Sequence, residues 1–202
     1  MQVSVLRNLL ASEVTEMDLG MIVDDIRNNQ KLFDKTNEYR QILTSGLKDD
    51  ILKFKRKHFQ AFAPNALLFD GKARDNVIGL TDLCFLDIDH INDSTQLDHA
   101  MALLRKDKHV VLAYKSVSGN GIHILIRYKV NGWNYPPNRT QMNAEAMQNR
   151  YKQVFDRLTN EYQKNLQLPI DKQTNNIECM CLISSDLDAY YNPDAEQLML
   201  AL

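Results

Sequence analysis

Two aspartates separated by one residue, Asp87 and Asp89, end the apolar run of residues 83–86. On a β-strand every second side chain points to the same face, so both carboxylates share a face and Ile88 points to the other. Two like charges this close are costly unless a cation compensates them, and Mg²⁺ or Mn²⁺ with oxygen ligands is the usual compensation. The pair therefore indicates a metal site, and the competing interpretation is two solvated acids at a strand end.

A second group of polar residues lies in the turn Ser-Val-Ser-Gly-Asn-Gly-Ile-His of residues 116–123, between two apolar runs. Gly119 and Gly121 allow the backbone N–H groups to approach an anion closely, and Ser116 and Ser118 add hydroxyl donors. His123 starts the following strand and is placed to donate to a triphosphate. The alternative is a plain hairpin loop followed by a hydrogen-bonded core histidine.

A third acid, Asp171, closes the short apolar run of residues 168–170. A two-metal site needs a further carboxylate beyond one acid pair, and Asp171 has a suitable local setting. Taken alone it is better interpreted as a solvated acid at a strand end. The order along the chain gives it weight, because an acid pair, a glycine turn with a histidine and a later acid follow one another. We therefore predict one site built from Asp87, Asp89, His123 and Asp171.

Secondary structure must position these residues, and the hydrophobic periodicity indicates which elements do so. Short apolar runs predict strands at residues 3–6, 67–69, 83–89, 110–114 and 122–128. Helical spacing predicts one helix that starts at residues 15–18, one at about 37–58 with Gly46 as its weak point, one from Asp93 or Ser94 to Leu104, and one at about 143–165. Residues 166–171 and 180–183 are expected to complete the sheet, and Asn192-Pro193 to begin a last helix.

Composition and charge limit the class of protein. The chain has 202 residues, 44% of them hydrophobic, and a formal net charge of −2, which is typical of a globular protein and not of a strongly basic nucleic-acid binder. Basic runs at residues 53–58 and 105–108 are interpreted as solvated helix ends, with phosphate binding as the alternative. Three cysteines without a signal peptide favour a reducing, cytoplasmic setting. No apolar run approaches the roughly 20 residues that cross a bilayer, so no membrane association is expected.

The three motifs FLDID, SVSGNGIH and LPID together resemble those of the archaeo-eukaryotic primase-polymerase superfamily. More narrowly, the chain is similar to the VirE N-terminal-like domain of phage and mobile-element replication proteins, which is often joined to a helicase. The resemblance also includes the FDG segment near Asp70 and the SSDLDAYYNP segment of residues 184–193.

The resemblance implies an α+β fold in which an RNA-recognition-like antiparallel or mixed sheet with backing helices joins a second α/β module. We expect a single domain over residues 1–202, with a helical and α/β part at about 1–80 and the motif-bearing sheet at about 81–202. It further implies a metal-dependent nucleotidyltransferase, similar to a DNA primase or polymerase, that acts on nucleoside triphosphates and a DNA or RNA template, with a helicase as a possible partner.

The resemblance also assigns residue roles. Mg²⁺ or Mn²⁺ would be held by Asp87, Asp89 and Asp171. The residues expected to contact the nucleotide phosphates are Ser116, Ser118, Gly119, Gly121 and His123, with Lys115 as a further contact.

The sequence departs from the family pattern after the third acid. Relatives usually place an arginine there, whereas this chain has Ile177-Glu178-Cys179-Met180 and no basic residue between Gln173 and Ile183. Loss of that charge favours an alternative function, a catalytically inactive nucleotide- or nucleic-acid-binding module of a replication helicase. A metal-dependent phosphohydrolase is a third possibility, but the usual DxDxT context is missing because His90-Ile91 follow Asp89.

Overall fold

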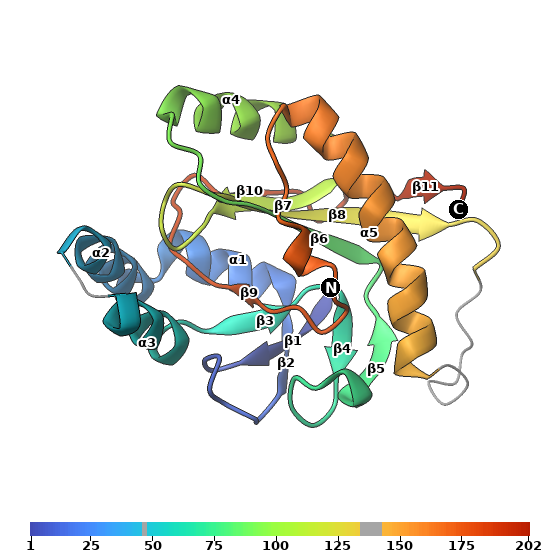
Figure 1. Ribbon diagram of the computed structural model, residues 1–202, viewed down its shortest axis with the longest axis horizontal. Helices are drawn as coiled ribbons and strands as arrows, with labels where there is room; N and C mark the ends of the chain where they lie inside the picture. The colour runs from blue at the N-terminus through green and yellow to red at the C-terminus, as the bar shows by residue number, and fades with distance from the viewer. Residues whose placement is uncertain (46–47, 134–142) are drawn as a thin grey trace.

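The structure is a computed structural model that describes residues 1–45, 48–133 and 143–202. These residues form a mixed α and β fold with two main sheets, whose strands are largely antiparallel, and five α-helices (Figure 1). The α+β class expected from the sequence is confirmed at this level. No helix among the described residues is both long and apolar enough to span a membrane.

The central sheet carries the motif residues. Its strands are β6 (Leu83–Ile88), β7 (Val110–Lys115), β8 (Ile122–Val130), β10 (Tyr190–Tyr191) and β11 (Leu198–Leu200). β8 pairs with β6 and β7 in antiparallel fashion and with β11 in parallel fashion, and β10 extends the other edge of β7. β6 and β8 lie side by side, with Asp87 opposite His123.

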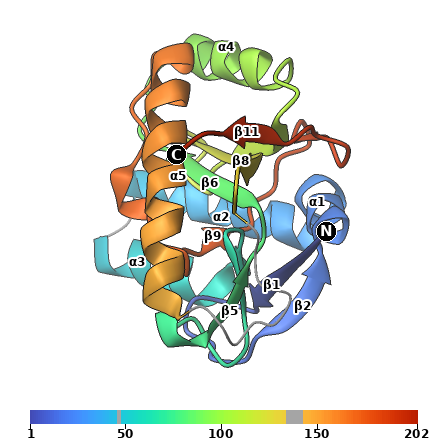
Figure 2. The ribbon, with the colours of Figure 1, turned by 90° about the vertical axis from the view of Figure 1, so that its right-hand side faces the viewer.

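Both faces of the central sheet are covered, which explains why its strands are almost continuously apolar. α4 (Ser94–Leu104) and α5 (Ala144–Leu166) pack on the face that carries Ile122, Ile124 and Ile126. α1 (Leu19–Asn28) packs on the opposite face, against Phe85 and Leu125. Figure 2 shows α5 running past β6 and on to β5 (Val77–Leu80), which it also contacts.

A second sheet lies on the far side of α1. Its strands follow the order β2 (Thr15–Asp18), β1 (Gln2–Leu6), β3 (Ala61–Ala63) and β9 (Cys181–Leu182), and all pairs are antiparallel. A separate hairpin joins β4 (Ala66–Leu68) to β5. Because β9 comes from the C-terminal part of the chain, both halves of the sequence contribute to this sheet.

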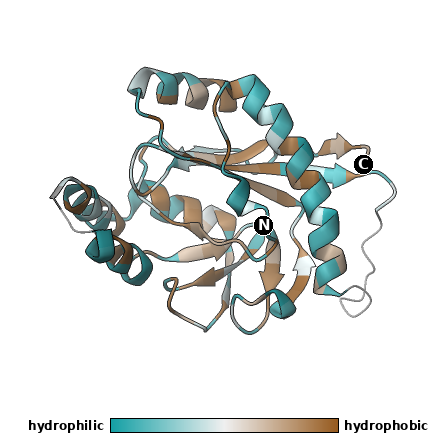
Figure 3. Ribbon diagram, in the orientation of Figure 1, coloured by the Kyte–Doolittle hydropathy of each residue, from teal (hydrophilic) through white to brown (hydrophobic). Residues whose placement is uncertain are grey.

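Two further helices, α2 (Gln30–Ser45) and α3 (Lys48–His58), lie together at one end of the molecule. α3 has no fully buried residue, and Figure 3 shows both helices to be largely hydrophilic. A small cluster fixes them to the body: Tyr39 of α2 packs with Phe59, Val117 and Leu182, and the partly buried Ile51 and Phe54 of α3 join it.

Several predicted elements are wrong. Residues 15–18 form strand β2, and α1 begins only after Asp18, whose Oδ1 accepts a hydrogen bond from the Gly20 N–H at 2.8 Å. Residues 30–58 contain two helices where one was predicted from residue 37, and the predicted weak point Gly46 lies outside the described residues.

The C-terminal predictions also need correction. Residues 168–171 form no strand, because the chain leaves α5 through a left-handed Gln167 and runs in an irregular conformation to Asp171. Residues 181–182 do form a strand, but it joins the N-terminal sheet and not the central one. No helix begins at Asn192-Pro193, where a turn connects β10 to β11 instead.

Candidate metal and nucleotide site

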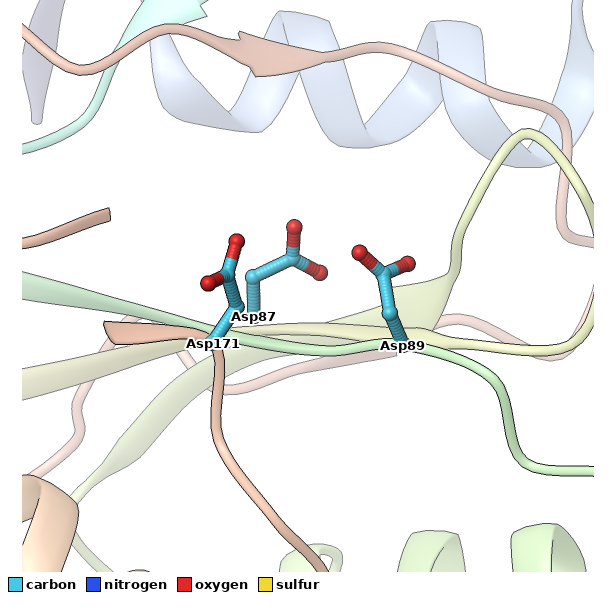
Figure 4. Close-up of side chains that lie close together, drawn as sticks. All are labelled: Asp87, Asp89 and Asp171. Carbon is cyan, nitrogen blue, oxygen red and sulfur yellow. The ribbon is translucent and has the colours of Figure 1, made fainter. Parts of the chain in front are cut away.

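Strand β6 and the segment after α5 bring three carboxylates together. Asp87 lies near the end of β6, and Asp89 follows one residue after the strand. Asp171 is held beside them because its backbone N–H donates to the Asp87 carbonyl oxygen at 2.8 Å. One oxygen from each of the three carboxylates lies within 4.8 Å of the other two. In Figure 4 all three side chains rise on the same side of the strand, so residues 84 positions apart form one acidic cluster.

Asp171 is also fixed by the backbone that follows it. Its Oδ1 accepts a hydrogen bond from the Gln173 N–H at 2.9 Å, which caps the short 3₁₀ helix Lys172–Thr174. The Thr174 hydroxyl donates to the Asp171 carbonyl oxygen at 2.8 Å. The carboxylate is therefore oriented by its own loop and keeps a second oxygen for another ligand.

The Oδ1 of Asp87 lacks a hydrogen-bond partner among the residues that the structure describes. The side chain of Asp87 is only 16% exposed. The Nε2 of His123 lies 3.6 Å from the Oδ1, which is too distant for a hydrogen bond. Burial and the adjacent negative charge of Asp89 raise the pKa of Asp87 to about 7, against the opposing influence of Lys55.

His123 does not supply the missing positive charge. Burial, together with the positive charge of Lys55, lowers the pKa of His123 to about 3, so the ring is neutral at neutral pH. A carboxylate oxygen without a hydrogen-bond partner, beside two further acids, therefore fits a cation that prefers oxygen ligands. Mg²⁺ and Mn²⁺ are cations of this kind. Asp87, Asp89 and Asp171 are the residues that would hold it.

The sequence allowed two interpretations of His123, a donor to a triphosphate and a hydrogen-bonded core histidine, and the imidazole has features of both. Its side chain is 8% exposed, its Nδ1 lies 3.3 Å from the Sγ of Cys181, and its ring meets the rings of Phe85 and Tyr114 edge to face. It is thus packed as a core histidine, while its Nε2 edge points to Asp87 and borders the cavity described below.

The glycine turn closes tightly against the end of β6. The Ser116 N–H donates to the Gly121 carbonyl oxygen at 2.9 Å, and the two hydroxyls of Ser116 and Ser118 lie 3.0 Å apart. A Cβ atom on Gly121 would lie 2.4 Å from the Ile88 carbonyl oxygen and 2.8 Å from the Ser116 hydroxyl. Only glycine permits this approach, which brings both serines beside the acids.

Gly119 has a different role in the turn. Its φ of +83° is a left-handed conformation that L side chains rarely adopt. A Cβ atom there would lie 3.0 Å from the Nε of Arg40, so the turn also needs glycine to fit against α2. The backbone of this turn therefore requires glycine at both positions, Gly119 and Gly121.

A cavity of about 90 Å³ joins these groups. Its walls include Asp87, Asp89, Ser116, Ser118 and His123, all of which were predicted as site residues. This volume is too small for a whole nucleotide and suits metal ions and a phosphate group. A neighbouring hollow, lined by Asp89, Asp171, His90 and Gln173 among others, places the acids at the border between two recesses.

Sequence reasoning missed part of the cavity wall. Lys55 of α3, Thr174, Met180 and Leu182 also line it. The basic run around Lys55 was visible in the sequence, but nothing local distinguishes this lysine from its solvated neighbours. Leu182 reaches the cavity only through the pairing of β9 with β3, which no local pattern indicates.

Lys115, the further phosphate contact implied by the resemblance, is not among the residues that line this cavity. Strand alternation puts Tyr114 on the His123 face and Lys115 on the opposite face. Its backbone is held by the segment at residues 184–193. The Lys115 N–H donates to Asp186 at 2.9 Å, and the Ser184 hydroxyl donates to the Lys115 carbonyl oxygen at 2.7 Å.

Residues 53–191 match the family described as BT4734-like, N-terminal domain. This match covers more than half of the chain and includes the acid pair, the glycine turn and Asp171. The chain belongs to this family. No curated protein and no solved structure matches this BT4734-like domain. The family description states no activity, so the geometry of the site is the basis for its function.

Proposed function

We propose that this BT4734-like domain is a metal-dependent nucleotidyltransferase of the primase-polymerase type. One observation carries the proposal: Asp87, Asp89 and Asp171 come within 4.8 Å of one another beside a serine- and glycine-containing turn. The acids offer only oxygen ligands, and the turn offers the hydroxyls of Ser116 and Ser118. In the free protein Ser116 donates to Ser118 and Ser118 to the Asn120 Oδ1, so both hydroxyls would turn to donate to a phosphate. This combination is what a metal-bound nucleoside triphosphate requires.

The residues divide the work between two sides of the site. Asp87, Asp89 and Asp171 would hold one or two divalent cations, which when bound lower the pKa of an attacking 3′-hydroxyl and stabilise charge on the phosphate. Ser116 and Ser118 orient the triphosphate on the side of the turn. The base and sugar lie outside the small cavity, where a template strand can select them. Catalysis rests on positioning and electrostatics and needs no side-chain nucleophile.

In this proposal the central sheet corresponds to the RNA-recognition-like core of the superfamily. The N-terminal sheet with α1, α2 and α3 corresponds to the second α/β module, and the site lies where the two meet. The substrates are nucleoside triphosphates with Mg²⁺ or Mn²⁺, and the partners are a DNA or RNA template and a replication helicase of a phage or mobile element.

Primer extension with Mg²⁺ or Mn²⁺ tests the activity. Asp89→Asn is the most informative variant, because Asp89 is exposed and its replacement leaves the core intact. Asp98→Asn on the exposed side of α4 removes one negative charge away from the site and serves as the matched control. We expect wild type and Asp98→Asn to extend primers and Asp89→Asn to lose at least a hundredfold in rate. Equal rates in all three proteins would refute the assignment.

A second candidate is a catalytically silent module that binds nucleotides without joining them. The segment after Asp171 favours it, because Glu178 stands in the region where relatives usually carry an arginine. Its carboxylate forms an ion pair with Arg74, with 2.9 Å between Oε1 and Nη2. Metal-dependent binding of a nucleoside triphosphate, with no extended product in the same assay, would identify this function.

A further inference from the structure

Lys55 differs from the other basic residues of α3. Lys53, Arg56 and Lys57 are exposed to solvent, whereas Lys55 is partly buried and lines the cavity that contains Asp87 and Asp89. Ile51 lies one turn before Lys55 on the same helix. Ile51 packs on the cluster of Tyr39, Val117 and Leu182 and so holds the helix in this orientation. Val117 and Leu182 also line the cavity, so the packing that fixes α3 also aims Lys55 at the site.

The charge balance of the cavity sets this lysine apart. Among the residues that line it, Lys55 is the sole lysine or arginine. Yet its ammonium group has no ion pair within 4.0 Å in the described parts of the chain. A cation that lines an acidic cavity without a fixed carboxylate partner is available for an anion that arrives with the metal.

Rigid support for this arrangement comes from α2. The Arg40 guanidinium donates to the Val117 carbonyl oxygen at 3.2 Å and to the Ser116 carbonyl oxygen at 3.4 Å. Arg40 is thus a positioning residue that fixes the turn against α2. The α2–α3 pair therefore holds the turn and places Lys55 in the wall of the cavity that Ser116 and Ser118 also line.

We propose that Lys55 binds the phosphate groups of a nucleoside triphosphate, together with Ser116 and Ser118. This inference rests on the proposed function and adds a specific phosphate contact to it. When a metal compensates the charge of the three acids, the positive charge of Lys55 is not used by them. A lysine ammonium group is a compact cation that donates hydrogen bonds to phosphate. It also supplies, from the N-terminal part of the chain, a positive charge that residues 173–183 lack.

The test compares Lys55→Gln with Lys53→Gln, an exposed lysine on the same helix, and with Lys55→Arg. Isothermal titration calorimetry measures the affinity for Mn²⁺ alone, for a nucleoside triphosphate with Mn²⁺, and for the nucleoside without phosphates. We expect Lys55→Gln to lose about tenfold in triphosphate affinity, as for one charge-assisted hydrogen bond. Its affinity for Mn²⁺ should stay equal or rise, because a repelling charge is gone. Lys53→Gln and Lys55→Arg should remain within twofold of wild type.

The outcomes separate this inference from the proposed function. If wild type binds the triphosphate with Mn²⁺ and Lys55→Gln binds it equally well, the lysine contact is wrong and the function stands. The lysine contact is also wrong if Lys55→Gln and Lys53→Gln lose affinity equally, because the effect would then be general electrostatic attraction. If wild type binds no triphosphate in the presence of Mn²⁺, both proposals fail.

Discussion

Replacing Asp87 by asparagine should make the metal-free protein more stable while removing its response to metal. The carboxylate is buried, its Oδ1 has no hydrogen-bond partner among the described residues, and its pKa is raised from 3.8 to about 7. That difference corresponds to about 4 kcal/mol of unfavourable free energy for the ionised side chain in the folded state. Asparagine has almost the same shape and carries no charge.

The net gain in the free energy of unfolding of Asp87→Asn is smaller than this ionisation penalty of Asp87. A buried amide whose donors are incompletely satisfied costs about 1–3 kcal/mol, which offsets part of the benefit. We therefore expect metal-free Asp87→Asn to be about 1–3 kcal/mol more stable than wild type at pH 8. At about 2–4 °C per kcal/mol for a chain of this length, the melting temperature should rise by about 2–12 °C.

The pH dependence fixes the cause of the effect. An acid whose pKa is raised on folding favours the folded state below its unfolded pKa, and this contribution is lost as pH rises through the folded pKa. The wild type should therefore lose about 4 kcal/mol of stability relative to Asp87→Asn between about pH 4 and pH 7. The order of the two proteins should reverse within this range, with wild type the more stable one at pH 4. Differential scanning calorimetry in buffer that contains a chelator, across this pH range, measures the difference in stability between the two proteins.

Added metal should reverse the order of stability. At a hundred times its dissociation constant, a ligand that binds only the folded state adds about 2.7 kcal/mol. Saturating Mn²⁺ should thus raise the melting temperature of wild type and of the control Asp98→Asn, and leave Asp87→Asn nearly unchanged. If metal-free Asp87→Asn is no more stable than wild type at pH 8, Asp87 is not a destabilised carboxylate and its Oδ1 does not need a cation.

Two further predictions concern the same site. Because Asp87 must be ionised to bind a cation, Mn²⁺ affinity should fall as pH drops below about 7, by up to tenfold per pH unit; titrations from pH 5.5 to 8 check this, and a flat profile would contradict the shifted pKa. Gly121→Ala should destabilise the protein by about 1–3 kcal/mol, because the new Cβ would meet the Ile88 carbonyl oxygen at 2.4 Å. Gly79→Ala is its control, since a Cβ there meets nothing within 4 Å. Similar melting temperatures for the two glycine variants would show that the turn can move away from β6.

The parts of the fold that the sequence predicted well are those with strong local periodicity. The strands at residues 83–88, 110–115 and 122–130 and the long helix α5 follow directly from apolar runs and helical spacing. Errors arose where tertiary pairing decides the outcome. Residues 15–18 form a strand only because β1 lies beside them, and residues 181–182 belong to the N-terminal sheet only because β3 has a free edge there.

The candidate site also combines features that a local pattern predicts with features that depend on tertiary contacts. That Asp87 and Asp89 share a face was predictable, because strand alternation is a local rule. The position of Asp171 was expected for the wrong local reason, since its segment forms no strand and is held by one backbone hydrogen bond to Asp87. The orphaned oxygen of Asp87 could not be predicted at all, because it depends on the distance to His123 across two strands.

The way in which the distant segments meet explains why the site lies where it does. β6 supplies two acids, and the chain that leaves α5 passes along β6, where it adds Asp171, before it crosses to the N-terminal sheet as β9. This crossing brings Leu182 under α3 and thereby supports the helix that presents Lys55. One connection thus links the acidic side of the cavity to its basic side. A change that loosens β9 should therefore disturb triphosphate binding more than metal binding, because the three acids are anchored on β6 and Lys55 is not.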